Sequence, residues 1–123
     1  MNADDLLLLL ARVLAGGAFI VIGIRILRGL PLVADLLKSK RIPLPKLVAQ
    51  CGAIIEIVLG ALAISGFWLF EVAIAMAAFV IVATLMVHDI WNTRGPQREK
   101  ELNVILSNTI IVGGLLAIAA SAR

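Results

Sequence analysis

The stretch LVAQCGAIIEIVLGALAISGFWLFEVAIAMAAFVIVATLMV, residues 47–87, decides the fold of this chain. It contains two long apolar runs, 47–65 and 69–87, and only a tight turn at Gly66, Phe67 and Trp68 separates them. A helix needs roughly 20 predominantly apolar residues to cross the hydrocarbon core of a bilayer, so each run is long enough to span it. We therefore expect two membrane-spanning helices joined by a short turn.

Two further apolar runs, residues 6–24 and 104–120, flank this pair. The 123-residue chain is 62% hydrophobic and has a mean hydropathy of +1.08, whereas a soluble domain is only about half apolar. A chain this short cannot bury so much apolar surface in one small core, so the predicted solvent is lipid. The predicted fold is all-α: a single domain, residues 1–123, that forms a membrane-spanning four-helix bundle with both termini on the same side.

The connections between the spans carry most of the positive charge. The basic residues of the two longer connections are Arg25, Arg28, Lys38, Lys40, Arg41, Lys46, Arg94, Arg98 and Lys100. Because Lys and Arg accumulate in cytoplasmic loops, we expect both connections to be cytoplasmic and both termini to lie outside. Residues 33–40 are expected to form a short amphipathic helix on the membrane surface. The net charge of +3 reflects these loops and does not indicate nucleic-acid binding.

Two charged residues lie more than one helical turn inside the predicted spans. Arg12 shares a helix face with Gly16, and Glu56 shares one with Gly52 and Gly60. Small residues let helices approach closely in lipid, and a charge at membrane depth normally has a partner. We therefore predict an Arg12–Glu56 ion pair. Two roles stay open: a structural pair that sets the helix register, and a function of Glu56 in proton or ligand handling.

A second polar layer is expected at the cytoplasmic boundary. The residues that would converge there are Arg25, Gln50, His88, Asp89, Asn103 and Asn108. Two interpretations of His88 and Trp91 stay open. In the first, His88 caps a helix and Trp91 anchors the chain at the membrane interface. In the second, both residues belong to a binding site. Asp89 is expected to pair with His88, Arg25 or Arg94. The predicted ligand-binding residues are Gln50, His88, Asp89, Trp91 and Asn108.

The residue counts exclude several kinds of site. The single cysteine, Cys51, allows no intrachain disulfide and no paired-thiol motif. The single histidine excludes a bis-histidine haem within one chain. Zinc sites usually need three or four Cys, His or carboxylate ligands, so no metal site is predicted, although a homodimer would supply two histidines. No catalytic residue is assigned, and whether the protein is an enzyme stays open.

Four segments together resemble the DoxX family of small four-helix integral membrane proteins. Residues 38–66 contain a lysine-rich loop, an Ile-Pro-Leu-Pro segment and a span with Glu56 near its middle. Residues 83–92, ATLMVHDIWN, are similar to the family's His-x-Phe-Trp ending, with Ile90 in place of Phe. Residues 106–119, LSNTIIVGGLLAIA, are similar to its fourth helix, with Ser107 in place of Lys. Residues 10–27, LARVLAGGAFIVIGIRIL, are similar to its first helix.

The positions of this chain that match the family's motifs are Arg12, Glu56, His88, Trp91 and Asn108. The resemblance implies a membrane subunit or anchor of a quinone-linked redox assembly, in the inner (plasma) membrane of a prokaryote. The predicted site would then hold the polar head of a quinone or a lipid, and His88 with Asp89 would deliver a proton to a quinone reduced there. Quinone is the one cofactor that the redox interpretation suggests.

The partners implied are the lipid bilayer, a larger membrane or peripheral redox protein, and further copies of the chain in a homo-oligomer. Two alternatives to the redox interpretation stay open. One is a non-enzymatic membrane scaffold or assembly protein that uses its small-residue faces. The other is a small-molecule carrier with Glu56 as the coupling carboxylate.

Overall fold

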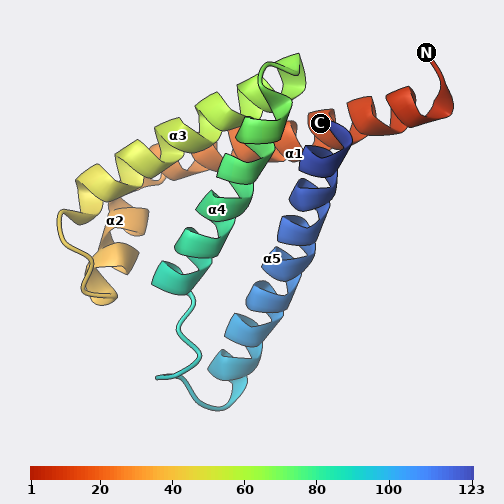
Figure 1. The fold of residues 1–123 in the computed structure, drawn as a ribbon. Helices are drawn as coiled ribbons and strands as arrows, with labels where there is room; N and C mark the ends of the chain where they lie inside the picture. The colour runs from red at the N-terminus through yellow and green to blue at the C-terminus, as the bar shows by residue number, and fades with distance from the viewer.

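The structure, a computed structural model, describes all 123 residues and contains only helices and their connections (Figure 1). The elements are α1 (Ala3–Arg28), α2 (Leu30–Ser39), α3 (Pro45–Ser65), α4 (Leu69–Val87) and α5 (Pro96–Ser121). The helices α1, α3, α4 and α5 are each long and apolar enough to cross a membrane. The predicted all-α fold with four membrane-spanning helices is therefore confirmed.

Two of the four long helices extend well beyond their apolar runs. α5 begins at Pro96 rather than at residue 104. Proline suits the first position of a helix, and the polar residues that follow it include strong helix formers. α1 begins at Ala3, where Asn2 and Asp5 form a capping box, and continues to Arg28. An apolar run thus marks the part of a helix that suits lipid, whereas the caps determine where the helix itself begins.

The short helix α2 was predicted over residues 33–40 and is present over Leu30–Ser39. Its one buried side chain, Leu37, faces the bundle, while Lys38 is exposed. The connection from α2 to α3 turns sharply, because Arg41 and Leu44 both adopt positive φ angles. α2 and the connection between α4 and α5 lie at one end of the bundle, here called the loop end. Both chain termini lie toward the opposite end, here called the terminal end (Figure 1).

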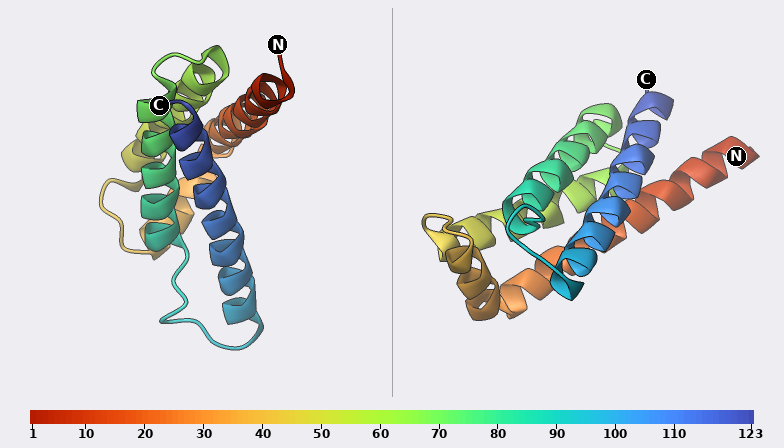
Figure 2. Two further views of the ribbon diagram at one scale, coloured as in Figure 1. Left: turned by 45° about the vertical axis from the view of Figure 1, so that its right-hand side comes forward. Right: turned by 90° about the horizontal axis from the view of Figure 1, so that it is seen from below.

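The long helices form two pairs, α1 with α3 and α4 with α5. The pairs cross at an angle, and the first turns of α1 project beyond the other helices (Figure 2). A tight turn joins the pairs, with Gly66 and Trp68 both in the left-handed region. Because the pairs cross, α1 has extensive contact with α3 but little with α5.

Glycine allows α1 and α3 to pack backbone against backbone. A Cβ atom added to Gly16 would lie 2.5 Å from the carbonyl oxygen of Gly60, and one added to Gly23 would lie 2.7 Å from that of Ala53. These distances are too short for any side chain, so both positions require glycine. The two contacts also establish the register of the pair, with Gly16 opposite Gly60 and Gly23 opposite Ala53.

The core that joins the pairs is built largely from small residues. Its buried members are Phe19, Ala63, Val72, Ala73, Met76, Ala77, Leu115, Ile118 and Ala119. Most lie toward the terminal end, where α3 turns into α4 and α5 ends. The apolar side chains on the outer faces remain exposed to the surroundings, as suits helices solvated by lipid.

Candidate functional site

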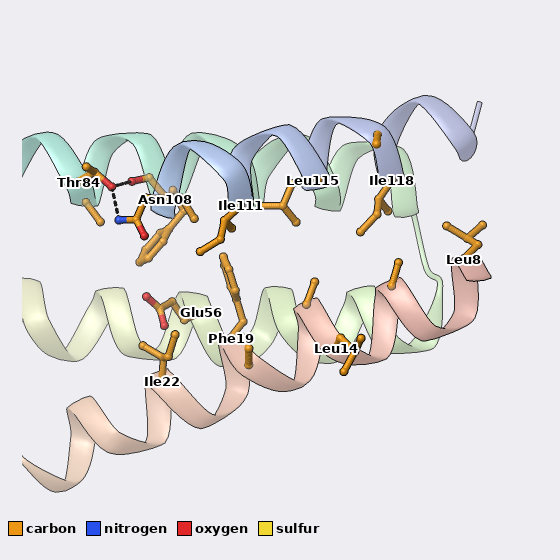
Figure 3. Close-up of a pocket in the computed structure, with 18 of the residues that line it drawn as sticks. Leu8, Leu14, Phe19, Ile22, Glu56, Thr84, Asn108, Ile111, Leu115 and Ile118 are labelled. Carbon is orange, nitrogen blue, oxygen red and sulfur yellow. Dashed lines mark hydrogen bonds between the residues drawn. The ribbon is translucent and has the colours of Figure 1, made fainter. Parts of the chain in front are cut away.

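A groove lies between α1 on one side and α4 and α5 on the other (Figure 3). Its volume is about 1190 Å³, and 17 of its 25 lining residues are hydrophobic. Leu14 and Ile111, from the two walls, are 71% and 44% exposed, so the groove is open between α1 and α5. Because that opening lies between two membrane-spanning helices, molecules dissolved in the bilayer have direct access to it.

Glu56 is the one residue of α3 that lines this groove. Its side chain points from α3 into the space between the walls (Figure 3). Glu56 is only 8% exposed, and its Oε2 atom has no hydrogen-bond partner. A buried carboxyl group without a partner is costly whether it is ionised or neutral. Of the groups that line the groove, Glu56 would therefore be stabilised most by a bound ligand or a proton.

Thr84 and Asn108 form a polar pair on the opposite wall. Thr84 donates its hydroxyl hydrogen to the carbonyl oxygen of Val80, at 2.6 Å. Its oxygen can then only accept, so the Asn108 side chain must present its Nδ2 atom, which lies 2.8 Å away. This arrangement leaves the Oδ1 atom of Asn108 and one N–H free to bind a ligand.

His88 closes the groove at the loop end. It is the C-cap residue of α4, and its Nδ1 atom lies 2.7 Å from Oε2 of Glu101 on α5. Gln97 donates to the other carboxylate oxygen of Glu101, at 3.1 Å. The His88–Glu101 pair therefore joins the end of α4 to α5 beside the groove.

Glu101 was not among the residues predicted from the sequence, because the expected fourth span began only at residue 104. A helix that starts at Pro96 places Glu101 about two turns before Asn108, on the same face. This spacing could have identified Glu101 from the sequence if Gly95-Pro96 had been recognised as the start of a helix.

The predicted Arg12–Glu56 ion pair is not formed. Arg12 donates from Nε to the carbonyl oxygen of Ala63, at 3.0 Å, and from Nη2 to that of Ile64, at 2.7 Å. With Gly16 opposite Gly60, Arg12 is level with the last turn of α3, and Glu56 lies about two turns deeper, roughly 12 Å away along the axis. The prediction was wrong because it measured both depths from the ends of the apolar runs, whereas α1 projects beyond α3.

The structure does not bring the whole predicted polar layer together. Gln50 lies on α3 outside the groove, and Trp91 is 78% exposed. Asp89 pairs with neither His88 nor an arginine, because it accepts hydrogen bonds from the Asn92 side chain and the Trp91 backbone. The bond from Asn92, followed by weaker ones from the backbone, holds the pKa of Asp89 below its ordinary value.

Two other residues expected in that layer, Arg25 and Asn103, are exposed and do not line the groove. Of the five predicted ligand-binding residues, the groove therefore contains His88 and Asn108. Glu56, predicted as an ion-pair partner, and Thr84 complete its polar lining at this level.

Comparison with known proteins supports the assignment suggested by the sequence motifs. The DoxX family model matches residues 7–89, which is more than half of the chain. The matched region runs from α1 to the residues just after α4, and therefore includes Glu56, Thr84 and His88. Comparisons with curated proteins and with solved structures gave no match. With four membrane-spanning helices and this match, the chain belongs to the DoxX family.

Proposed function

We propose that this protein binds a membrane-soluble amphiphile, a quinone or a lipid, in the groove between α1, α4 and α5. The observation that carries the proposal is an apolar groove, open toward lipid, that has Glu56 opposite the polar pair of Thr84 and Asn108. Ligand pockets typically have volumes of about 300–1,000 Å³ and apolar walls with a few polar groups that orient the ligand. A groove of about 1190 Å³ is sufficient for a polar head and a long apolar tail.

The polar head would bind near Thr84 and Asn108. The free N–H of Asn108 suits a quinone or ester carbonyl, and its Oδ1 atom suits a hydroxyl group. The tail would extend between Leu14 and Ile111 toward the terminal end. This places the head deeper in the groove than the sequence predicted, because Gln50, Asp89 and Trp91 do not take part.

In a redox assembly, such a site would present a quinone to a partner protein within the plane of the membrane. The His88–Glu101 pair would then exchange protons between the loop end and the bound head, in place of the expected His88–Asp89 pair. The DoxX assignment supports this role.

The second candidate function is that of a membrane assembly protein. Gly16, Gly23 and Gly60 are used within the chain, in the contact between α1 and α3. Gly113 is not, since a Cβ atom added there would meet nothing within 4 Å and the residue lies outside the groove. This part of α5 would let a helix of another subunit approach closely.

The experiment that tests ligand binding is mass spectrometry of organic extracts from the purified protein. We expect one quinone or one defined lipid, stoichiometric in the wild type and lost in Asn108→Leu, because leucine removes both hydrogen-bonding groups at the head site. Asn103→Leu is the matched control, since Asn103 lies on the same helix but is exposed outside the groove. Only bulk lipid in all three extracts would favour the assembly role.

A further inference from the structure

No cationic side chain is available to Glu56 within the groove. The remaining ionisable groups around it are distant or have partners: Asp4 and Asp5 line the groove at the terminal end, Arg12 is bound to carbonyl groups of α3, and His88 is paired with Glu101. α3 contributes no other residue to the groove, and α5 contributes no charged one. The acceptor atoms of Glu56 are thus open to whatever occupies the groove.

Two aromatic rings lie in the same part of the groove. Phe19 of α1 and Phe79 of α4 both line it, and their ring centroids are 6.2 Å apart with an interplanar angle of 57°. Phe19 and Glu56 are neighbours in Figure 3. Phe79 extends over Gly52, one turn from Glu56 on the same helix. Aromatic faces attract cations, and more strongly when water is excluded.

A carboxylate, two aromatic rings and apolar walls together complement one class of ligand. We propose that the groove binds a lipophilic organic cation, either a protonated hydrophobic amine or a quaternary onium ion, with its positive charge against Glu56. Opposite charges attract strongly where the effective dielectric constant is low. A small hydrophilic cation would lose more hydration free energy than its contact with Glu56 would restore, so the ligand must carry apolar groups of its own.

This inference goes beyond the proposed quinone or lipid site. Both kinds of ligand would occupy the groove, but the cation depends on the charge of Glu56, whereas a quinone or lipid head depends on the hydrogen bonds of Asn108. Each can therefore be lost without the other. The cation and a proton compete for the same carboxyl group, so cation binding is expected to tighten as the pH rises.

The test is equilibrium binding of tetraphenylphosphonium to the full chain in lipid nanodiscs, with empty nanodiscs as the baseline. We expect saturable binding to the wild type, weakened about ten- to a thousandfold in Glu56→Gln, the range that one close opposite charge contributes. Glu99→Gln, which removes an exposed carboxylate at the loop end, is the matched control and should bind as the wild type does. Tetraphenylborate, which has the same shape and the opposite charge, should show no saturable binding.

The proposal is overturned if the wild type binds no more tetraphenylphosphonium than empty nanodiscs do, or if Glu56→Gln binds as tightly as the wild type. A second measurement on the wild type avoids any folding defect of the variant. A hydrophobic carbodiimide should modify Glu56, as identified by peptide mass spectrometry, and tetraphenylphosphonium should protect it. Modification at the same rate with and without the cation would contradict the proposal.

Discussion

Arg12 and Glu56 are the two charged side chains furthest inside the helix pair α1 and α3, and their environments differ. Arg12 has two acceptors in the last turn of α3: the carbonyl group of Ala63, which also accepts from the Gly66 N–H, and that of Ile64, which has no backbone donor. The negative end of the helix dipole lies at the same place, so the arginine also compensates it. Glu56 has no partner at its Oε2 atom. At the scale of the residue, the arginine stabilises the structure and the carboxylate remains free to act on a ligand.

Replacement of Arg12 by leucine is expected to lower the free energy of unfolding by about 1–3 kcal/mol, because the partly buried carbonyl group of Ile64 loses its donor and that of Ala63 keeps only the Gly66 N–H. Arg25→Leu, at an exposed position of the same helix, is the control for the loss of charge. Unfolding can be followed by circular dichroism in mixed micelles.

The double variant Arg12→Leu/Glu56→Gln distinguishes this account from the ion pair that the sequence suggested. Groups without contact have additive effects, within about 0.5 kcal/mol. A coupling energy well above that value would show that the two side chains interact.

At the scale of the element, close approach of backbones determines which helices pair. The contact between α1 and α3 depends on Gly16 and Gly60, where the two backbones meet. α4 and α5 pair instead through alanine and larger apolar side chains, and through the Asn108–Thr84 hydrogen bond. The face of α1 left unpaired by this arrangement becomes one wall of the groove.

Gly16→Ala tests this contact. The added methyl group would lie 2.5 Å from a carbonyl oxygen of α3, so the helices must separate. The expected loss of stability is about 1–3 kcal/mol, the usual cost of overpacking. Gly17→Ala is the matched control, because a Cβ atom there meets nothing within 4 Å. It should leave the melting temperature unchanged or raise it slightly through higher helix propensity. Equal melting temperatures for the two variants would contradict the close packing of α1 on α3.

At the scale of the whole molecule, the groove results from the crossing of the two helix pairs (Figure 2). α1 packs on α3, beyond which its first turns project, and it diverges from α5. The space between them has no side chains large enough to fill it, and the same crossing brings Glu56 opposite Thr84 and Asn108 (Figure 3). The groove is therefore a property of the assembled bundle and of no single helix.

Filling the groove should abolish binding without unfolding the protein. Ala18 lines the groove from α1 and is exposed, so Ala18→Trp would occupy ligand space at little cost in packing. We expect at least about a tenfold loss of tetraphenylphosphonium binding, equivalent to about 1.4 kcal/mol, and loss of any copurified amphiphile. Ala61→Trp, at an exposed position of α3 outside the groove, is the control. Unchanged binding in Ala18→Trp would place the ligand elsewhere.

The four spans, the membrane environment and the candidate importance of Glu56, His88 and Asn108 could all be predicted from the sequence. These properties are local: the bilayer acts on each apolar segment separately, and a polar group within such a segment stands out wherever its neighbours lie. The family motifs, which are also local, identified DoxX.

Only the tertiary structure decided which polar groups meet. Register and crossing angle depend on backbone contacts such as Gly16 with Gly60, and on helix ends such as Pro96, which apolar runs do not reveal. A shift of two turns is enough to place Arg12 at the end of α3 instead of beside Glu56. The start of α5 at Pro96 makes Glu101, rather than Asp89, the partner of His88. Apolar side chains contact lipid and one another about equally well, so hydrophobicity alone does not select the register of membrane helices, and close packing and hydrogen bonds do.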